Sequence, residues 1–258
     1  MPAPTRRVVL LGASNLTRSF ATIVETVRQT WREPVELMVA MGHGRSYGQE
    51  TTVLGRKISG IFFSPLWQDL ERRPALPTVA FITDVGNDLL YDVPIDQLLE
   101  WVEGCHQRLT AVGAATVVTQ LPLGSLARLG EARFRFFRRV LFPRSSLTLS
   151  AALARAAETN DRILALGNCE KTSVISASDA WYGLDPIHLR RRAWREAWPT
   201  LFSSWRVADD GVIVPRTSLW NRAYLLSLAP HEQSIFGVRR RCAQPSGRLA
   251  DGTTISLY

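Results

Sequence analysis

RVVLLGASNL, residues 7–16, is a short apolar run that stops at a glycine and then presents a serine. The aliphatic run from Val8 to Leu11 is typical of a strand that a parallel sheet buries on both faces. The residues that follow have helical spacing, with an apolar face of Phe20, Ile23, Val24, Val27 and Trp31. Ser14 is therefore predicted on a strand-to-helix turn. Helix N–H groups there can stabilise an oxyanion beside its hydroxyl, although a helix cap or a phosphate-binding turn uses the same features.

The rest of the chain alternates between strands and helices. Further strands are predicted at residues 35–41, 79–82, 115–121 and 163–166. This alternation predicts a three-layer α/β fold around a doubly wound, five-stranded parallel sheet. From about Asp209 short β segments replace the pattern, at residues 212–214, 235–238 and 249–255, with a tight turn at Asp251-Gly252. We expect an α/β domain over residues 1–208 and a small β-rich extension over residues 209–258.

The composition suits one globular α/β domain of 258 residues. Arginine carries almost all of the net charge of +8, because Lys57 and Lys171 are the only lysines. The three cysteines, Cys105, Cys169 and Cys242, are too few and too scattered for a disulfide framework or a zinc site. We therefore expect no metal site and a reducing compartment. The basic balance is a weak sign of an anionic partner, and we expect no nucleic-acid partner.

Neither an export signal nor a membrane span is predicted from the sequence. The apolar run after Thr5-Arg6-Arg7 is shorter than the roughly 7–15 residues of a signal-peptide core. No stretch approaches the about 20 apolar residues of a transmembrane helix. We expect a cytoplasmic protein without membrane insertion, and the sequence leaves its oligomeric state open.

Glycine-rich and polar motifs follow the second and third predicted strands, and another lies near the end of the α/β region. They are Gly42-His43-Gly44-Arg45-Ser46, Asp84-Val85-Gly86-Asn87-Asp88 and Gly183-Leu184-Asp185-Pro186-Ile187-His188. The carboxyl ends of parallel strands are where open α/β sheets bind ligands. A serine hydroxyl needs a base to become a nucleophile, and the base needs a partner that fixes its tautomer. His188 and Asp185 can fill these two roles.

Together with Ser14, and in this chain order, the motifs resemble the four blocks of the SGNH (GDSL-like) hydrolase superfamily over about the first two hundred residues. The resemblance implies a flavodoxin-like SGNH fold and a catalytic triad of Ser14, His188 and Asp185. It also implies an oxyanion hole formed by the Ser14 N–H, the Gly44 N–H and the Asn87 side-chain amide. The implied function is a serine ester hydrolase that needs no metal and no organic cofactor, and an acyltransferase would use the same triad and acyl-enzyme.

The second block points to a substrate class. Gly44-Arg45-Ser46 is similar to this block in carbohydrate-acetylesterase members, so we expect a small-molecule or glycan ester with a short acyl group such as acetyl. His43, Arg45, Trp181 and Tyr182 are candidate substrate-binding residues beside the implied site.

The motifs also depart from the family pattern. Ala13 stands where an aspartate is common, Asn15 stands where leucine is frequent, and Gly86 is shifted by one place. Two functions without hydrolysis remain open. One is a glycan- or anion-binding module on the same fold, and the other is a flavodoxin-like nucleotide or phosphate binder.

Two arginine-rich stretches admit two interpretations each. Residues 133–139 interleave basic and aromatic side chains, which suits a membrane-surface or single-strand-binding feature. An amphipathic helix with Phe134, Phe137 and Leu141 facing inward, able to form a wall of the substrate cleft, explains the stretch more simply. Residues 190–195 carry four arginines, which suit a solvated helix face or attract an anionic substrate.

Overall fold

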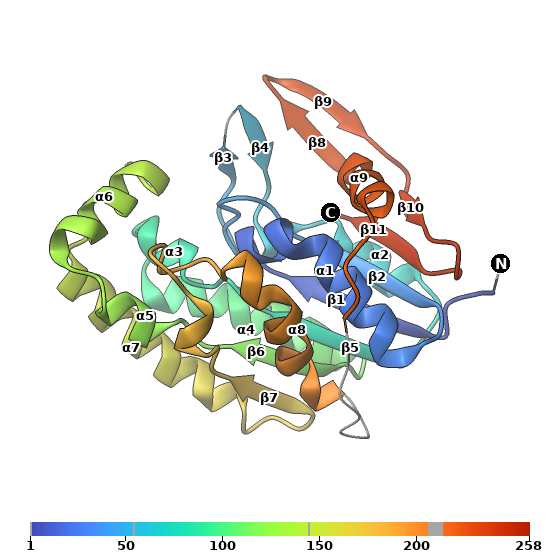
Figure 1. Ribbon diagram of the computed structural model, residues 1–258, viewed down its shortest axis with the longest axis horizontal. Helices are drawn as coiled ribbons and strands as arrows, with labels where there is room; N and C mark the ends of the chain where they lie inside the picture. Colours follow the sequence, from blue (N-terminus) through green and yellow to red (C-terminus); the bar gives the residue numbers. More distant parts are fainter. Residues whose placement is uncertain (1, 54, 144, 206–213) are drawn as a thin grey trace.

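The computed structural model describes residues 2–53, 55–143, 145–205 and 214–258, and it shows a mixed α/β fold (Figure 1). Within these residues the central sheet has seven strands in the order β10-β11-β2-β1-β5-β6-β7. All neighbouring strands are parallel except β10 and β11. The strands are β1 (Arg6–Leu11), β2 (Val35–Ala40), β5 (Thr78–Ile82), β6 (Ala115–Thr119), β7 (Thr172–Ile175), β10 (Gly247–Arg248) and β11 (Thr254–Leu257).

Strand β1 lies in the middle of the sheet, and its side chains enter two separate cores. Val8 and Leu10 pack into one hydrophobic cluster, while Val9 and Leu11 pack into the other. This division follows from the alternation of side chains along a strand. The helices α1 (Ser14–Trp31), α8 (Trp194–Leu201) and α9 (Leu219–Ser227) cover the first face, and α2 (Leu66–Arg72), α4 (Ile95–Ala111) and α7 (Leu149–Leu166) cover the second. The result is the predicted three-layer arrangement.

Shorter helices lie between these strands and helices along the chain. They are the α-helices α3 (Asn87–Leu90), α5 (Leu123–Ala127) and α6 (Glu131–Leu141), and the 3₁₀ helices η1 (Ile61–Phe63), η2 (Asp179–Trp181), η3 (Arg191–Ala193) and η4 (Ser203–Trp205). A separate antiparallel sheet has the order β3-β4-β8-β9, from β3 (Thr51–Val53), β4 (Arg56–Ile58), β8 (Glu232–Ile235) and β9 (Val238–Arg241). Figure 1 shows its two hairpins side by side, projecting from the body of the molecule.

The strand predicted at residues 163–166 is wrong, because these residues form the last turn of α7. The buried positions of α7 include Ala152, Ala156 and Ile163, a spacing that continues the helix through this apolar run. The strand that occupies this place in the sheet is β7, which begins at Thr172. A run of four apolar residues suits either structure, and the alanine-rich sequence before it decides for the helix.

The C-terminal extension is β-rich as predicted, but part of it belongs to the central sheet. Strand β11 pairs in parallel with β2, from Thr254 opposite Glu36 to Leu257 opposite Val39. The tight turn at Asp251-Gly252 joins β10 to β11, and Gly252 has a φ of 94°. The sheet therefore has two strands more than the five predicted. Of the strand predicted at residues 212–214, the first two residues lie outside the described residues.

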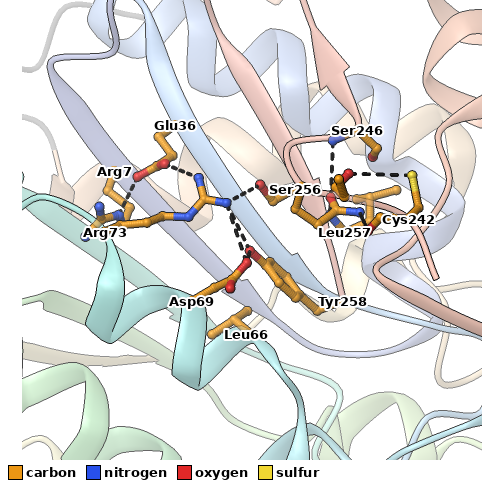
Figure 2. A network of polar contacts seen from close by, with 12 residues as sticks. Arg7, Glu36, Leu66, Asp69, Arg73, Cys242, Ser246, Ser256, Leu257 and Tyr258 are labelled. Atoms are coloured by element: carbon orange, nitrogen blue, oxygen red, sulfur yellow. Dashed lines mark hydrogen bonds and ion pairs between the residues drawn. The ribbon is translucent and has the colours of Figure 1, made fainter.

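A buried polar network fastens β11 to the first half of the chain (Figure 2). Arg7 on β1 donates from Nε to Glu36 on β2 at 2.6 Å, and Arg73 donates to the other oxygen of the same carboxylate. Arg73 also donates to the Ser256 hydroxyl at 3.2 Å, while the Tyr258 hydroxyl donates to Asp69 at 2.7 Å. Ions buried here need these partners, so the network specifies where the C-terminal strand docks.

No helix among the described residues has the length and apolar character that crossing a bilayer requires.

Candidate active site

Ser14, His188 and Asp185 form a chain of hydrogen bonds at the carboxyl edge of the sheet. Ser14 is the first residue of α1, directly after β1. Its Oγ lies 2.8 Å from Nε2 of His188, and Nδ1 of His188 lies 2.6 Å from Oδ2 of Asp185. Residues far apart in sequence are thus brought within hydrogen-bond distance. The histidine is placed to accept the serine proton while the carboxylate fixes its tautomer.

The loop that carries His188 is shaped by two side chains. Oδ1 of Asp185 accepts hydrogen bonds from the backbone N–H groups of Ile187 and His188 at 3.2 and 3.3 Å, which closes a turn over the three-residue spacing. Nδ2 of Asn15 donates to the Ile187 carbonyl at 2.9 Å, and Oδ1 of Asn15 accepts from the Leu189 N–H at 2.9 Å. Asn15, one of the departures from the family pattern, therefore ties the histidine loop to the start of α1.

Asp84 fixes the turn that carries Ser14, a role the sequence analysis missed. It follows β5, and one carboxylate oxygen accepts from the N–H groups of Ala13 and Asn15 at 2.9 and 3.0 Å. The other oxygen accepts from the Asn15 amide at 2.7 Å. Asp84 adopts a φ of 60°, a conformation that aspartate tolerates better than most residues. A carboxylate at the N-terminus of a helix satisfies its first amides, so Asp84 anchors the turn on both sides of Ser14.

The environment of Asp185 keeps its carboxylate ionised. Burial alone would raise its pKa, but the hydrogen bond and charge of His188 and the bond from the Ile187 N–H lower it below the usual value. Arg18, one turn after Ser14, adds to this effect because its Nη1 lies 3.6 Å from Oδ2 of Asp185. An ionised carboxylate is the form that stabilises a protonated histidine.

The implied oxyanion donors come from three loops at the same edge of the sheet. Asn87 begins α3 after β5, is 7% exposed, and lines the same pocket as Ser14. Gly44 lies after β2 with a φ of 62°, and a Cβ there would come within 2.8 Å of the Tyr91 hydroxyl. Only glycine fits this position easily. The Asn87 amide donates to the Arg45 carbonyl at 3.3 Å, which links the loops of Gly44 and Asn87.

A buried carboxylate strengthens this link. Asp88 accepts a hydrogen bond from the Tyr47 N–H at 3.0 Å and another from the Ser46 hydroxyl. Asp88 has no exposed surface, and burial raises its pKa to about 6. Its bonds hold the glycine-rich loop against the start of α3, so Asp88 positions the loops and does not face the pocket.

The candidate substrate-binding residues are placed differently from one another. Tyr182 lines the pocket beside Ser14, and His43 is exposed. The pKa of His43 is lowered by partial desolvation and by the positive charge of nearby groups that include His188. Trp181 is 6% exposed and donates from Nε1 to the exposed Glu196 at 2.9 Å.

The expected contact between the Arg45 side chain and substrate is wrong. Arg45 is 1% exposed and donates from Nε to the Ser59 carbonyl at 3.0 Å. Its Nη1 donates to the carbonyls of Met41, at 3.3 Å, and Tyr258. The Arg45 guanidinium therefore spends its hydrogen bonds on buried backbone carbonyls. Tyr258 is within reach because β11 pairs with β2 and ends beside Arg45. Arg45 therefore braces the loop of Gly44 from behind.

An apolar pocket opens beside Ser14. Its wall is formed by α5 and α6 and by the inner face of α7, where Ala152 and Ala156 are buried. The predicted amphipathic helix is α6, with Phe134 buried, Phe137 half-buried and Leu141 39% exposed. The large apolar side chains on this wall are Leu123, Leu126, Leu129, Phe134, Phe137 and Leu141. The second interpretation of residues 133–139, as a wall of the cleft, describes their position in the structure.

Comparisons with known proteins bear on the fold. No protein-family model and no curated protein matches the chain. Among solved structures, a GDSL-like lipase from Bacteroides thetaiotaomicron is 14% identical, with a TM-score of 0.50, and the match covers 80% of this chain and 91% of the lipase. A putative acylhydrolase from Bacteroides fragilis is 13% identical, with a TM-score of 0.51, covering 79% of this chain and 89% of the acylhydrolase. The chain therefore has the fold of the SGNH, or GDSL-like, hydrolases.

Proposed function

We propose that this chain is a serine ester hydrolase whose nucleophile is Ser14. The observation that carries the proposal is the chain of two hydrogen bonds, 2.8 Å from Ser14 to His188 and 2.6 Å from His188 to Asp185. A helix cap or a phosphate-binding turn would need neither His188 nor Asp185. The names of the similar structures, a GDSL-like lipase and a putative acylhydrolase, support the same class of reaction.

The geometry supports acyl transfer in two halves. In the first, Ser14 Oγ attacks the ester carbonyl and its proton passes to Nε2 of His188, while ionised Asp185 stabilises the imidazolium. The N–H groups of Ser14 and Gly44 and the Asn87 amide stabilise the oxyanion. His188 then protonates the departing alcohol. In the second half, water gives a proton to His188 and attacks the acyl-enzyme, which releases the acid and restores Ser14.

The apolar pocket beside Ser14 is the proposed acyl site. Leucine and phenylalanine side chains of α5 and α6 line it, and such a surface is favourable for methylene groups leaving water. The likeness of Gly44-Arg45-Ser46 to the second block of carbohydrate acetylesterases favours a short acyl group such as acetyl. The pocket instead favours a longer apolar chain, because acetyl would leave most of this wall without a contact.

The decisive experiment combines turnover with covalent labelling. We expect the wild-type protein to hydrolyse p-nitrophenyl esters and to be labelled at Ser14 by a fluorophosphonate, since the reagent needs an activated serine. Ser14→Ala should lose labelling and fall to the background rate while remaining folded by circular dichroism. Ser203→Ala, at an exposed serine, is the matched control and should keep both activities. Turnover retained by Ser14→Ala, or a wild type that neither turns over nor is labelled, would refute the proposal.

Shortening the pocket should change the preferred chain length. Ala156 is 2% exposed on the inner face of α7, and leucine there would occupy space that a long acyl chain uses. We expect Ala156→Leu to lower kcat/KM for p-nitrophenyl octanoate roughly tenfold relative to p-nitrophenyl acetate, as expected for losing the burial of one or two methylenes. Ala154→Leu, on the exposed face of the same helix, is the control. If a folded Ala156→Leu protein kept the wild-type ratio of kcat/KM between octanoate and acetate esters, the pocket would not be the acyl-binding site.

A further inference from the structure

A second, open groove meets the proposed catalytic residues. It is lined by Gly183, Leu184, Asp185, His188 and Leu189, together with the arginines Arg18, Arg190, Arg191 and Arg192. We call it the arginine groove. Leu189 also lines the apolar pocket, and the histidine in the groove lies 2.8 Å from the serine in the pocket. A substrate bound at Ser14 can therefore place its acyl chain in the pocket and its leaving group in the groove.

The charges that line the arginine groove are strongly unbalanced. Among the described residues that line it, four arginines face one carboxylate, that of Asp185, which is already bonded to His188 and lies 3.6 Å from Arg18. Arg191 and Arg192 are exposed, and within the described part of the chain neither has a carboxylate at ion-pair distance. A groove with this surplus of positive charge attracts an anion and concentrates it beside the triad.

Arg190 is held in place along the groove. Its backbone N–H donates to the Trp181 carbonyl at 2.8 Å, and its Nη2 donates to the Ala180 carbonyl. A Cβ on Gly183 would lie 3.0 Å from Cδ of Arg190, so the glycine lets the arginine stem pack against the loop. The Nε of Arg190 is buried without a hydrogen-bond partner in the described structure, although a buried donor normally has one. An anion in the groove would supply an acceptor.

We propose that the substrate is an acyl ester or thioester whose leaving group carries a phosphate, which the arginine groove binds. This inference rests on the proposed hydrolase function and adds the class of leaving group. Guanidinium groups bind phosphate oxygens through paired, charge-assisted hydrogen bonds. When the acyl–oxygen or acyl–sulfur bond breaks, the acyl group stays on Ser14 and His188 gives its proton to the departing atom. The phosphorylated alcohol or thiol leaves through the groove, and water releases the acid.

The test uses two matched pairs of substrates that differ only in the phosphate. One pair is 1-octanoylglycerol and 1-octanoylglycerol 3-phosphate, and the other is S-octanoylpantetheine and its 4′-phosphate. We expect kcat/KM for the phosphorylated member to be about tenfold higher or more in at least one pair, mainly through KM, because charge-assisted bonds to phosphate are among the stronger ones. The pair with the larger ratio identifies the source of the phosphate, a glycerophosphate headgroup or a phosphopantetheine arm.

Variants show whether the groove causes the preference. In Arg191→Gln/Arg192→Gln the ratio between phosphorylated and unphosphorylated substrate should fall toward one. Arg239→Gln/Arg240→Gln, on the exposed strand β9, removes the same charge elsewhere and should keep the wild-type ratio. Circular dichroism checks the fold of both.

The outcomes separate the two proposals. Equal rates within both pairs for the wild type, or a ratio unchanged by Arg191→Gln/Arg192→Gln, would overturn the phosphate site and leave the hydrolase standing. A protein that hydrolyses none of the four substrates and no p-nitrophenyl ester would overturn the hydrolase and the phosphate site together.

Discussion

Replacing Asp185 by asparagine is expected to lower kcat about 10³–10⁴-fold while the protein stays folded. Oδ2 of Asp185 accepts from Nδ1 of His188 at 2.6 Å, which leaves Nε2 free to accept the Ser14 proton. An asparagine amide can present N–H to the ring instead, which favours the wrong tautomer and removes the charge that stabilises the imidazolium. Steady-state turnover of a p-nitrophenyl ester measures the effect.

A control variant and the KM of Asp185→Asn separate this role from a structural one. Asp161→Asn, at an exposed position on α7, makes the same chemical change away from the site and should keep wild-type kcat. The asparagine at position 185 can still accept from the N–H groups of Ile187 and His188, so the turn should survive and KM should change little. An Asp185→Asn protein with more than a tenth of wild-type kcat would contradict the assigned role.

The lowered pKa of Asp185 also predicts how the stability of the folded protein depends on pH. Because the folded-state pKa is lowered, ionisation of Asp185 stabilises the folded protein above the unfolded pKa, and this contribution is lost as the pH falls through the folded value. The melting temperature of the wild type should therefore drop more steeply on acidification below about pH 4 than that of Asp185→Asn. Parallel curves would show that the carboxylate is not stabilised in the way the contacts indicate.

Much of the site could be predicted because its residues follow strands. Ser14 follows β1, Gly44 follows β2 and Asn87 follows β5. In a parallel sheet the carboxyl ends of the strands lie at one edge. Recognising each strand from its own sequence is therefore enough to predict that the residues after these strands lie close together. The Asp185 to His188 spacing adds a fourth local signal, since the aspartate closes its own turn.

What could not be predicted depends on contacts between distant segments. Arg45 looked like a substrate contact because nothing local shows that Tyr258, 213 residues later, returns to accept its hydrogen bond. The anchoring role of Asp84 depends on the amides of the Ser14 turn, which reach it only after β1 and β5 pair. The two additional strands of the sheet have the same origin. Strand β11 joins the sheet by pairing with β2, and β10 joins it by pairing with β11, so nothing local shows that the C-terminal β segments belong to the central sheet.

Replacing Asn87 by alanine is expected to lower kcat about 10²–10³-fold, the usual cost of removing one oxyanion donor. The amide nitrogen carries two hydrogens, of which one bonds the Arg45 carbonyl at 3.3 Å and the other is available to a developing negative charge. Since this charge exists only in the transition state, KM should change little. Turnover and KM for a p-nitrophenyl ester measure the effect, with Asn168→Ala, at an exposed asparagine, as the control.

A structural role for Asn87 would give a different result. If its bond to the Arg45 carbonyl only held the Gly44 loop in place, Asn87→Ala would lower the melting temperature and raise KM together with the loss of kcat. If Asn87 stabilises the oxyanion, fluorophosphonate labelling of Ser14 should slow, because its phosphoryl oxygen develops negative charge in the same place. If a folded Asn87→Ala protein were labelled as fast as the wild type, Asn87 would not be an oxyanion donor. The N–H groups of Ser14 and Gly44 would then be the donors.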